Sequence, residues 1–257
     1  MPHYQRYVAI GDSSTEGIHD PDGAGSFRGW ANRLAERIAR TQGSLLYANL
    51  AIRGRRTSRI REEQLERALA MRPDLATLFS GTNDVVARHF DPKEVASDIE
   101  FMHRALIDGG ARVLTFTLPD LTPVMPLGRL VASRIEALNQ TLREVASRTG
   151  ALLVDFAAHP VASDPRLWNA DRLHANAAGH QRMADALAHA LSLPGTDTSW
   201  TEPLPAAPPR SAFERLHAEA SWTRSYLLPW AWRHLRGRSS GDDVTAKRPE
   251  LLPVEVR

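Results

Sequence analysis

The chain has 257 residues, of which 42% are apolar and 24% are charged, and these values exclude a disordered or fibrous protein because they match ordinary soluble globular proteins. Its 32 basic and 30 acidic residues give a net charge of +2, so the composition predicts no nucleic-acid partner. Cysteine is absent, which excludes disulfides, thiolate zinc sites and a cysteine nucleophile, and leaves hydrolytic chemistry to hydroxyl or carboxylate groups.

The amino-terminal segment passes straight into a strand-like run. It lacks the charged flank, the apolar stretch and the small-residue cleavage site of a secretory signal. Elsewhere in the chain, no apolar run approaches the roughly 18 residues of a membrane span. We therefore expect a cytoplasmic protein without integral membrane insertion.

Five short runs of β-branched or apolar residues predict the strands of one sheet. In chain order they are Tyr7–Ile10, Leu45–Leu50, Leu75–Phe79, Val113–Thr117 and Leu152–Phe156. Apolar residues at helical spacing lie between these runs, around positions 30–38, 60–69, 95–106 and 130–145. This alternation predicts a three-layer α/β domain, in which helices cover both faces of a five-stranded parallel sheet.

The composition changes after about Leu193, where proline becomes frequent. We therefore divide the chain into a main domain over residues 1–193 and a second part over residues 194–257. The second part comprises a Pro-rich linker and a carboxyl-terminal arm, which is helical from Ala212 to about Leu228 and otherwise irregular. Tryptophan and arginine are concentrated in this part, at Trp200, Trp222, Trp230, Trp232, Arg224, Arg233, Arg236 and Arg238.

Two interpretations of the carboxyl-terminal arm remain open. Aromatic and basic residues together suit peripheral contact with a membrane surface. The tryptophans equally suit packing against the main domain or against a second subunit. The sequence does not predict the oligomeric state.

The segment Gly11-Asp12-Ser13 directly follows the first predicted strand. In parallel α/β sheets ligands bind beyond the carboxyl ends of the strands, so a nucleophile is well placed at Ser13. The amino terminus of a following helix would stabilise negative charge there. The same residue types are also common in turns and helix caps. This segment therefore predicts a nucleophile only in combination with other motifs.

Asp171 and His174 lie three residues apart, just before the last helical pattern of the main domain. On a turn, this spacing lets the carboxylate accept a hydrogen bond from one ring nitrogen of His174 while the other nitrogen faces Ser13. The pair therefore predicts a catalytic triad. One alternative is a surface Asp with a helix-capping His. Another is a metal site of His174, His180 and Asp185, but this set has no recognised ligand spacing and we expect no metal.

Two further positions follow predicted strands. Asn83 comes after the third strand, and its side-chain amide can donate to an oxyanion. Gly54 comes after the second strand, and a glycine lets its backbone N–H approach a ligand closely. Each residue alone is typical of an ordinary turn. Because the carboxyl ends of parallel strands meet at one edge of a sheet, we expect both residues to lie near Ser13.

These four blocks, in this order, resemble the SGNH-hydrolase family, also called GDSL esterases and lipases. The family's named residues correspond here to Ser13, Gly54, Asn83 and His174, and the resemblance covers about residues 6–193. It implies a flavodoxin-like fold and a shallow, open site. It also implies an oxyanion hole formed by the backbone N–H groups of Ser13 and Gly54 and the amide of Asn83. A G-x-S-x-G motif is absent, which argues against the ordinary α/β-hydrolase fold.

We therefore predict a serine esterase that hydrolyses carboxylic esters of small alcohols, sugars or lipids through an acyl-enzyme on Ser13. Its partner would be a small-molecule ester, and we expect no cofactor. An acyltransferase would use the same triad to pass the acyl group to a sugar or another alcohol, and the sequence does not distinguish the two. A phosphate- or nucleotide-binding module with residues 11–17 as an anion cradle is a third interpretation, but it leaves Asp171 and His174 unexplained.

Candidate substrate-binding residues come from three places. Asp12 lies beside the predicted nucleophile. Arginines are frequent near the predicted site, and Arg55 and Arg88 could hold a carboxylate or a phosphate, although solvated loops also contain many arginines. The loop over residues 118–130 carries Met125 and Leu127, which could form the wall of an acyl pocket or pack as in any loop.

Overall fold

The computed structural model describes residues 3–206, 208, 211–229, 232 and 240–255. Its centre is one mixed sheet of six strands in the order β5-β4-β3-β1-β2-β6. Five strands are parallel and match the predicted runs to within about two residues: β1 (Arg6–Gly11), β2 (Leu46–Asn49), β3 (Leu75–Phe79), β4 (Arg112–Phe116) and β5 (Leu152–Val154). The order of these five strands is the flavodoxin-like one.

The sixth strand, β6 (Arg248–Pro253), corrects the prediction of a five-stranded sheet. It pairs with β2 in the antiparallel direction, with Tyr47 opposite Leu252 and Asn49 opposite Arg248. The segment contains two prolines and shows no clear alternation, so its sequence does not predict a strand. Proline is tolerated there because β6 is an edge strand, where a missing backbone donor breaks no ladder.

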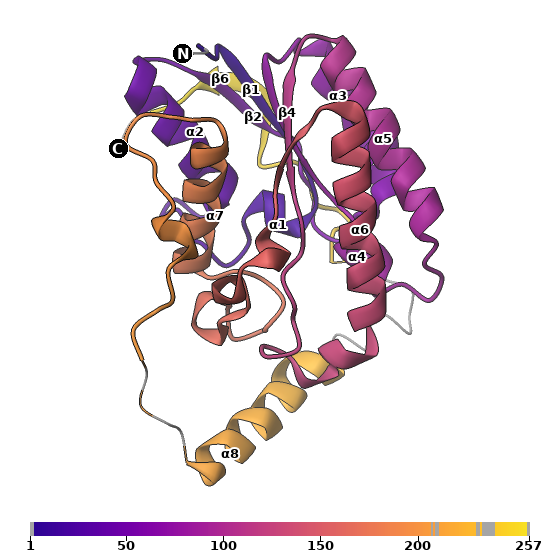
Figure 1. Ribbon diagram of the computed structural model, residues 1–257, viewed down its shortest axis with the longest axis vertical. Helices are drawn as coiled ribbons and strands as arrows, with labels where there is room; N and C mark the ends of the chain where they lie inside the picture. Colours follow the sequence, from indigo (N-terminus) through magenta and orange to yellow (C-terminus); the bar gives the residue numbers. More distant parts are fainter. Residues whose placement is uncertain (1–2, 207, 209–210, 230–231, 233–239, 256–257) are drawn as a thin grey trace.

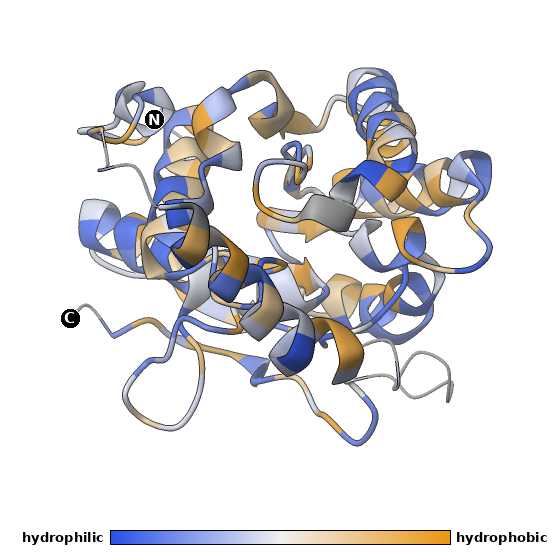
Figure 2. Ribbon diagram, turned by 90° about the horizontal axis from the view of Figure 1, so that it is seen from below, coloured by the Kyte–Doolittle hydropathy of each residue, from blue (hydrophilic) through white to orange (hydrophobic). Residues whose placement is uncertain are grey.

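Helices cover both faces of the sheet, so the predicted three-layer α/β fold is confirmed (Figure 1). On one face lie α2 (Gly29–Gln42) and α7 (Ala177–Ala190), and on the other lie α3 (Thr57–Ala70), α5 (Pro92–Asp108) and α6 (Ala132–Thr149). Apolar and polar residues alternate along these helices, as expected for helices with one buried face (Figure 2). On α2, for example, Trp30, Leu34 and Ile38 are fully buried.

The shorter helices lie at the ends of strands or in the connections. They are α1 (Ser13–Glu16), α4 (Thr82–Val85), α8 (Ala212–Trp222), the π-helical turn Thr223–Leu227, and the 3₁₀ turns Pro126–Leu130, Phe156–Ala158, Pro160–Ser163, Pro165–Leu167 and Ser199–Thr201. Within the described ranges, no helix combines the length and apolar character that crossing a membrane requires.

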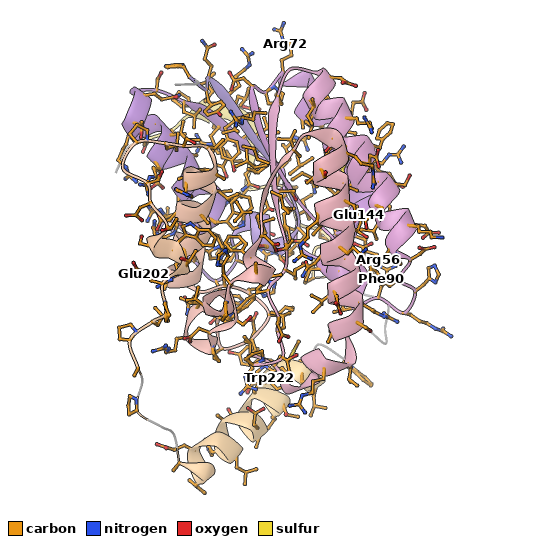
Figure 3. All side chains as sticks on the ribbon, in the orientation of Figure 1. Arg56, Arg72, Phe90, Glu144, Glu202 and Trp222 are labelled. Carbon is orange, nitrogen blue, oxygen red and sulfur yellow. The ribbon has the colours of Figure 1, made fainter. Side chains whose placement is uncertain are left out.

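Several contacts join the carboxyl-terminal arm to the main domain. β6 lies in the sheet, and Lys247 Nζ donates to the carbonyls of Phe27 and Arg28 at 2.8 and 3.0 Å. Trp222 at the end of α8 is buried, and its Nε1–H donates to the backbone carbonyl of Asp171 at 3.0 Å (Figure 3). Trp232 is 57% exposed. The other tryptophan and three of the arginines of the arm lie outside the described residues: Trp230, Arg233, Arg236 and Arg238.

Two glycines bring α1 against α2. Gly17 follows α1 and Gly29 opens α2, and both have positive φ angles, of 84° and 64°. A Cβ atom built on Gly29 would lie 2.4 Å from the Cα of Gly17. The backbones therefore touch at a distance that only glycine permits, and this contact helps to hold the helix that begins with Ser13.

We expect Gly29→Ala to lower the free energy of unfolding by roughly 3 kcal/mol or more. The new methyl group must displace backbone atoms, and the alanine must adopt a positive φ. Gly43→Ala is the matched control, since Gly43 has a φ of 90° but open space around its Cβ position. Gly43→Ala should lower the free energy of unfolding by only about 1–2 kcal/mol. Urea unfolding of both variants measures the difference, and equal losses would contradict the close packing of the two helices.

Candidate active site

Ser13 lies at the carboxyl end of β1, at the point where the strand turns into α1. The turn begins at Gly11, where a Cβ atom would lie 2.3 Å from Thr15 Oγ1 and 2.6 Å from the Phe79 carbonyl oxygen. Gly11 also exchanges two hydrogen bonds with the Gln64 amide, at 2.8 and 2.9 Å. Both restraints fix the backbone just before Ser13.

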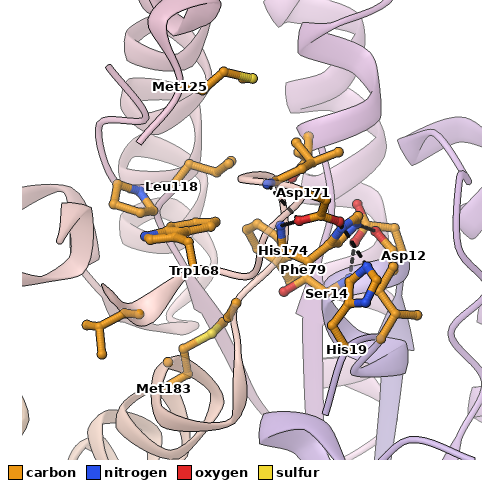
Figure 4. A pocket seen from close by; sticks show the side chains of 18 of the residues that line it. Asp12, Ser14, His19, Phe79, Leu118, Met125, Trp168, Asp171, His174 and Met183 are labelled. Atoms are coloured by element: carbon orange, nitrogen blue, oxygen red, sulfur yellow. Dashed lines mark hydrogen bonds and ion pairs between the residues drawn. The ribbon is translucent and has the colours of Figure 1, made fainter. Parts of the chain in front are cut away.

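Ser13, His174 and Asp171 form one chain of hydrogen bonds, although Ser13 and His174 are 161 residues apart. His174 Nε2 lies 2.9 Å from Ser13 Oγ, and His174 Nδ1 lies 2.6 Å from Asp171 Oδ2. With its proton on Nδ1, the imidazole donates to the carboxylate and accepts from the serine hydroxyl. The three residues of the predicted triad are therefore brought together, and Figure 4 shows the contact between Asp171 and His174.

The turn that carries Asp171 and His174 is held at both ends. The Asn169 backbone N–H donates to the His174 carbonyl at 2.8 Å. Asn176 caps α7, because its Oδ1 accepts from the N–H groups of Ala178 and Gly179 at 3.0 and 3.1 Å. These bonds fix the direction in which the His174 ring leaves the backbone.

The Asp171 carboxylate receives four hydrogen-bond donors. Its Oδ1 accepts from the backbone N–H groups of Leu173 and His174, and its Oδ2 accepts from His174 and from His19 Nε2 at 2.9 Å. Burial acts to raise the pKa of Asp171, but the bonds from His174 and His19 outweigh it and hold that pKa well below its usual range. Asp171 is therefore ionised and suited to stabilise an imidazolium.

Asn83 and Gly54 lie at the same edge of the sheet as Ser13. Asn83 belongs to α4, after β3, and Gly54 follows β2 with a φ of 74°. The Asn83 amide nitrogen donates to the Arg55 carbonyl at 3.0 Å and to Asp12 Oδ2 at 3.2 Å. Both residues line the cavity that contains Ser13, as the three parallel strand ends predict.

Asp12 is fully buried next to Ser13. Its Oδ1 accepts from the Ser14 N–H at 3.0 Å, and its Oδ2 accepts from Asn83. Burial raises the pKa of Asp12 to about 7, and the nearby Asp84 carboxylate adds to the effect. Asp12, which the sequence predicts to bind substrate, lines the same cavity as Ser13, and its contacts orient Asn83 and the start of α1.

The triad opens into a cavity of about 580 Å³. Most of its walls are apolar, and on the side opposite the triad they include Leu118, Met125, Trp168 and Met183 (Figure 4). The carboxyl-terminal arm contributes Trp222, Tyr226 and Leu227. Met125 lines this cavity, whereas the side chain of Leu127, the other residue predicted for the wall of an acyl pocket, is outside the described part of the structure. A cavity of this composition suits a hydrocarbon chain.

The family model of the GDSL-like lipase/acylhydrolase family matches residues 9–182. The chain belongs to this family. It is 30% identical over 199 residues to the GDSL lipase Rv0518 of Mycobacterium tuberculosis, a match that covers 72% of this chain and 81% of the relative. Family membership supports a hydrolase that acts on esters.

Solved structures similar to this GDSL-like protein have the same fold. LAE5, an α/β hydrolase enzyme from the metagenome of Lake Arreo, aligns with a TM-score of 0.62 and 24% identity over 73% of this chain and 95% of that chain. A catalytic mutant of Axe2, an acetylxylan esterase from Geobacillus stearothermophilus, aligns with a TM-score of 0.62 and 17% identity over 78% of this chain and 97% of that chain. At these identities the likeness concerns the fold.

The two arginines predicted to hold an anionic substrate group lie away from the cavity of this GDSL-like protein. Arg55 donates through Nε to Glu63 at 2.7 Å, and Arg88 is exposed. Neither is among the residues that line the cavity. Arg53 does line it, but its guanidinium is paired with Glu16 beneath the site. Arg53 and Arg55 thus form ion pairs within the protein.

His174, His180 and Asp185, the alternative metal site considered from the sequence, do not come together in the fold. His180 is buried between α7 and α2, where its Nδ1 accepts from the Trp30 N–H at 3.2 Å and its Nε2 lies 3.3 Å from the Ile18 carbonyl. Asp185 is paired with Arg37 at 2.7 Å. His180 and Asp185 therefore have structural partners, and neither is directed at His174.

Sequence reasoning missed two residues that contact the triad. His19 lies in the turn after α1, and Trp222 lies in the arm. No motif marks either residue, because each reaches Asp171 only through the packing of segments distant in sequence. A histidine six residues after the serine was the only available signal for the first.

Proposed function

We propose that the protein is a serine esterase in which Ser13 is the nucleophile, His174 the general base and Asp171 the residue that orients and stabilises the imidazole. The observation that carries the proposal is the chain of hydrogen bonds from Ser13 through His174 to an ionised Asp171, at the mouth of an apolar cavity. Membership of the GDSL-like family supports ester hydrolysis as the reaction.

The reaction would run in two halves. His174 Nε2 takes the proton of Ser13 as Oγ attacks the ester carbonyl carbon, and it then gives that proton to the departing alcohol oxygen as the C–O bond breaks. This leaves an acyl group on Ser13 Oγ. Water, deprotonated by the same imidazole, attacks the acyl carbon, and the free acid leaves as the serine regains its proton.

The oxyanion that forms on the carbonyl oxygen needs fixed donors. The backbone N–H groups of Ser13 and Gly54 and the amide of Asn83 are the proposed set, since all three residues line the cavity. Both hydrogens of the Asn83 amide are directed at protein oxygens, of which Asp12 Oδ2 is the more distant at 3.2 Å. We infer that the oxyanion takes over the hydrogen that points to Asp12.

The two other interpretations are an acyltransferase and a phosphate- or nucleotide-binding module. An acyltransferase would use the same acyl-enzyme, with an alcohol in place of water, and analysis of the products separates the two reactions. The phosphate- or nucleotide-binding interpretation loses support, because the backbone N–H and carbonyl of Gly11 are already paired with Gln64 and because it gives no role to the contacts among Ser13, His174 and Asp171. Hydrolysis is preferred over transfer because the family supports it.

We expect a fluorophosphonate probe to label the wild-type protein and to leave Ser13→Ala unlabelled, because only an activated serine attacks phosphorus. Hydrolysis of a short-chain aryl ester should fall by about 10⁶ in the same variant. Ser14→Ala is the matched control: Ser14 lines the same cavity and should keep the label. Labelling that survives in Ser13→Ala and disappears in Ser14→Ala would reassign the nucleophile.

Asn83→Ala should lower kcat by roughly 10²–10³ with little change in KM, since the lost hydrogen bond exists mainly in the transition state. Steady-state kinetics on the same aryl ester measure the effect. Thr82→Ala, at the neighbouring position of α4 and also in the cavity wall, serves as the control. A rise in KM at constant kcat would instead make Asn83 a residue for ground-state binding.

Met125→Trp should shorten the acyl chains that the protein accepts, because the larger side chain fills space in the cavity. We expect kcat/KM for a long-chain ester to fall roughly tenfold or more while that for an acetyl ester changes little. The acetyl ester controls for damage to the triad. An unchanged chain-length profile would place the acyl group elsewhere.

A further inference from the structure

A second histidine contacts the carboxylate of the triad, and the mechanism above does not use it. His19 Nε2 lies 2.9 Å from Asp171 Oδ2, the same oxygen that binds His174 Nδ1 at 2.6 Å. The two imidazole rings have centroids 5.5 Å apart (Figure 4). Three potential ligand atoms, one each from His19, Asp171 and His174, thus lie within 4.8 Å of one another.

The backbone presents His19 at this position with little freedom. Its neighbours Ile18 and Asp20 are buried, and Asp20 is held by Arg33 at 2.9 Å and by the Gly29 N–H at 3.0 Å. His19 itself has a φ of 68°, in the left-handed region. Its side chain is nevertheless 38% exposed, so the cluster can be reached from solvent. A fixed backbone and an accessible ring are the conditions for a preformed ligand site.

We propose that His19, Asp171 and His174 form a binding site for a first-row transition metal ion of the Zn²⁺ type, and that the bound metal switches the esterase off. The inhibitory part rests on the proposed function, since it requires His174 to be the general base. The metal-binding part does not.

The ligand set suits such an ion. Two imidazoles and one carboxylate are a common set for zinc, with bonds of about 2.0–2.2 Å, and imidazole favours such ions over Mg²⁺ or Ca²⁺. The carboxylate is already ionised, because the hydrogen bonds to Asp171 hold its pKa well below the usual range against the effect of burial. Small rotations of the two rings would bring their nitrogens from contact with Asp171 onto a shared ion.

Inhibition follows from the position of the ring proton of His174 when a metal is bound at Nδ1. In the triad, His174 carries its proton on Nδ1 and accepts the serine proton at Nε2. A metal at Nδ1 takes the lone pair there, so the proton of the neutral ring moves to Nε2. His174 then has no lone pair for Ser13, and the serine stays protonated. His19 would coordinate through Nε2, so the proton that it donates to Asp171 in the metal-free protein moves to Nδ1, and no proton leaves either neutral ring.

A purely supporting role for His19 makes a different prediction. If His19 only donated a hydrogen bond to Asp171, its replacement would change the uninhibited rate and leave the sensitivity to metal as it was. The metal site predicts that replacing His19 weakens inhibition by the metal. A supporting role predicts that only the uninhibited rate changes. For each variant, inhibition is therefore measured relative to its own uninhibited rate.

The first test is inhibition by Zn²⁺ in a buffer that does not chelate metals. We expect reversible inhibition of aryl-ester hydrolysis that EDTA relieves and that Mg²⁺ does not cause. In His19→Asn the half-inhibiting concentration should rise at least about tenfold, because one ligand is lost. Asparagine tolerates positive φ, so this variant should keep the fold.

The matched control is His89→Asn. His89 is an exposed histidine that lies 3.9 Å from Glu94, so it offers a His and carboxylate pair far from the triad. The control should keep the Zn²⁺ sensitivity of the wild type. Equal sensitivity in His19→Asn and wild type would overturn the proposal.

The second test measures binding without activity. Calorimetric titration of Zn²⁺ into Ser13→Ala, which retains all three ligands, should give one ion per chain, and this binding should disappear when His19→Asn is added. Binding that depends on His19 but does not inhibit the wild type would overturn both the switch and the role of His174 as base. Absence of binding, with esterase activity intact, would overturn only the metal site.

Discussion

The hydrogen bond between His174 and Ser13 is the contact on which the site depends, because it joins two segments from opposite ends of the main domain. It forms only if α7 has the right place beside α2. The two helices are tied by His180, whose ring accepts a hydrogen bond from the Trp30 N–H. Burial lowers the pKa of His180 to about 4, so the ring is neutral near pH 7 and able to accept. A structural histidine thus supports the one proposed for catalysis.

Two aspartates near the serine illustrate how environment decides chemistry. Asp171 receives four donors and stays ionised, whereas Asp12 receives two and its pKa rises to about 7 on burial. The negative charge therefore resides next to the His174 imidazole, where in the proposed mechanism it stabilises a transient positive charge. In the proposed mechanism, a second fixed charge next to Asn83 would oppose the developing oxyanion, and the raised pKa of Asp12 reduces the charge at that position.

The carboxyl-terminal arm extends the site beyond the region shared with the family. The family model matches residues 9–182, yet Trp222, Tyr226 and Leu227 line the cavity. The Trp222 indole also donates to the backbone of Asp171, and Arg172 pairs with Glu219 of α8 at 2.7 Å. The arm thereby forms part of the cavity wall and touches the triad. Differences in substrate preference among relatives are expected to reside in such additions.

Local sequence determined most of the strands, the helices and the four blocks around Ser13, Gly54, Asn83 and His174. Apolar periodicity reports which faces are buried, and parallel strands place their carboxyl ends at one edge, so residues after those strands converge. Packing alone decided that β6 joins the sheet, that His19 and Trp222 reach Asp171, and that Arg55 turns to Glu63. Such contacts join segments whose own patterns do not specify a partner, and only the assembled fold brings them together.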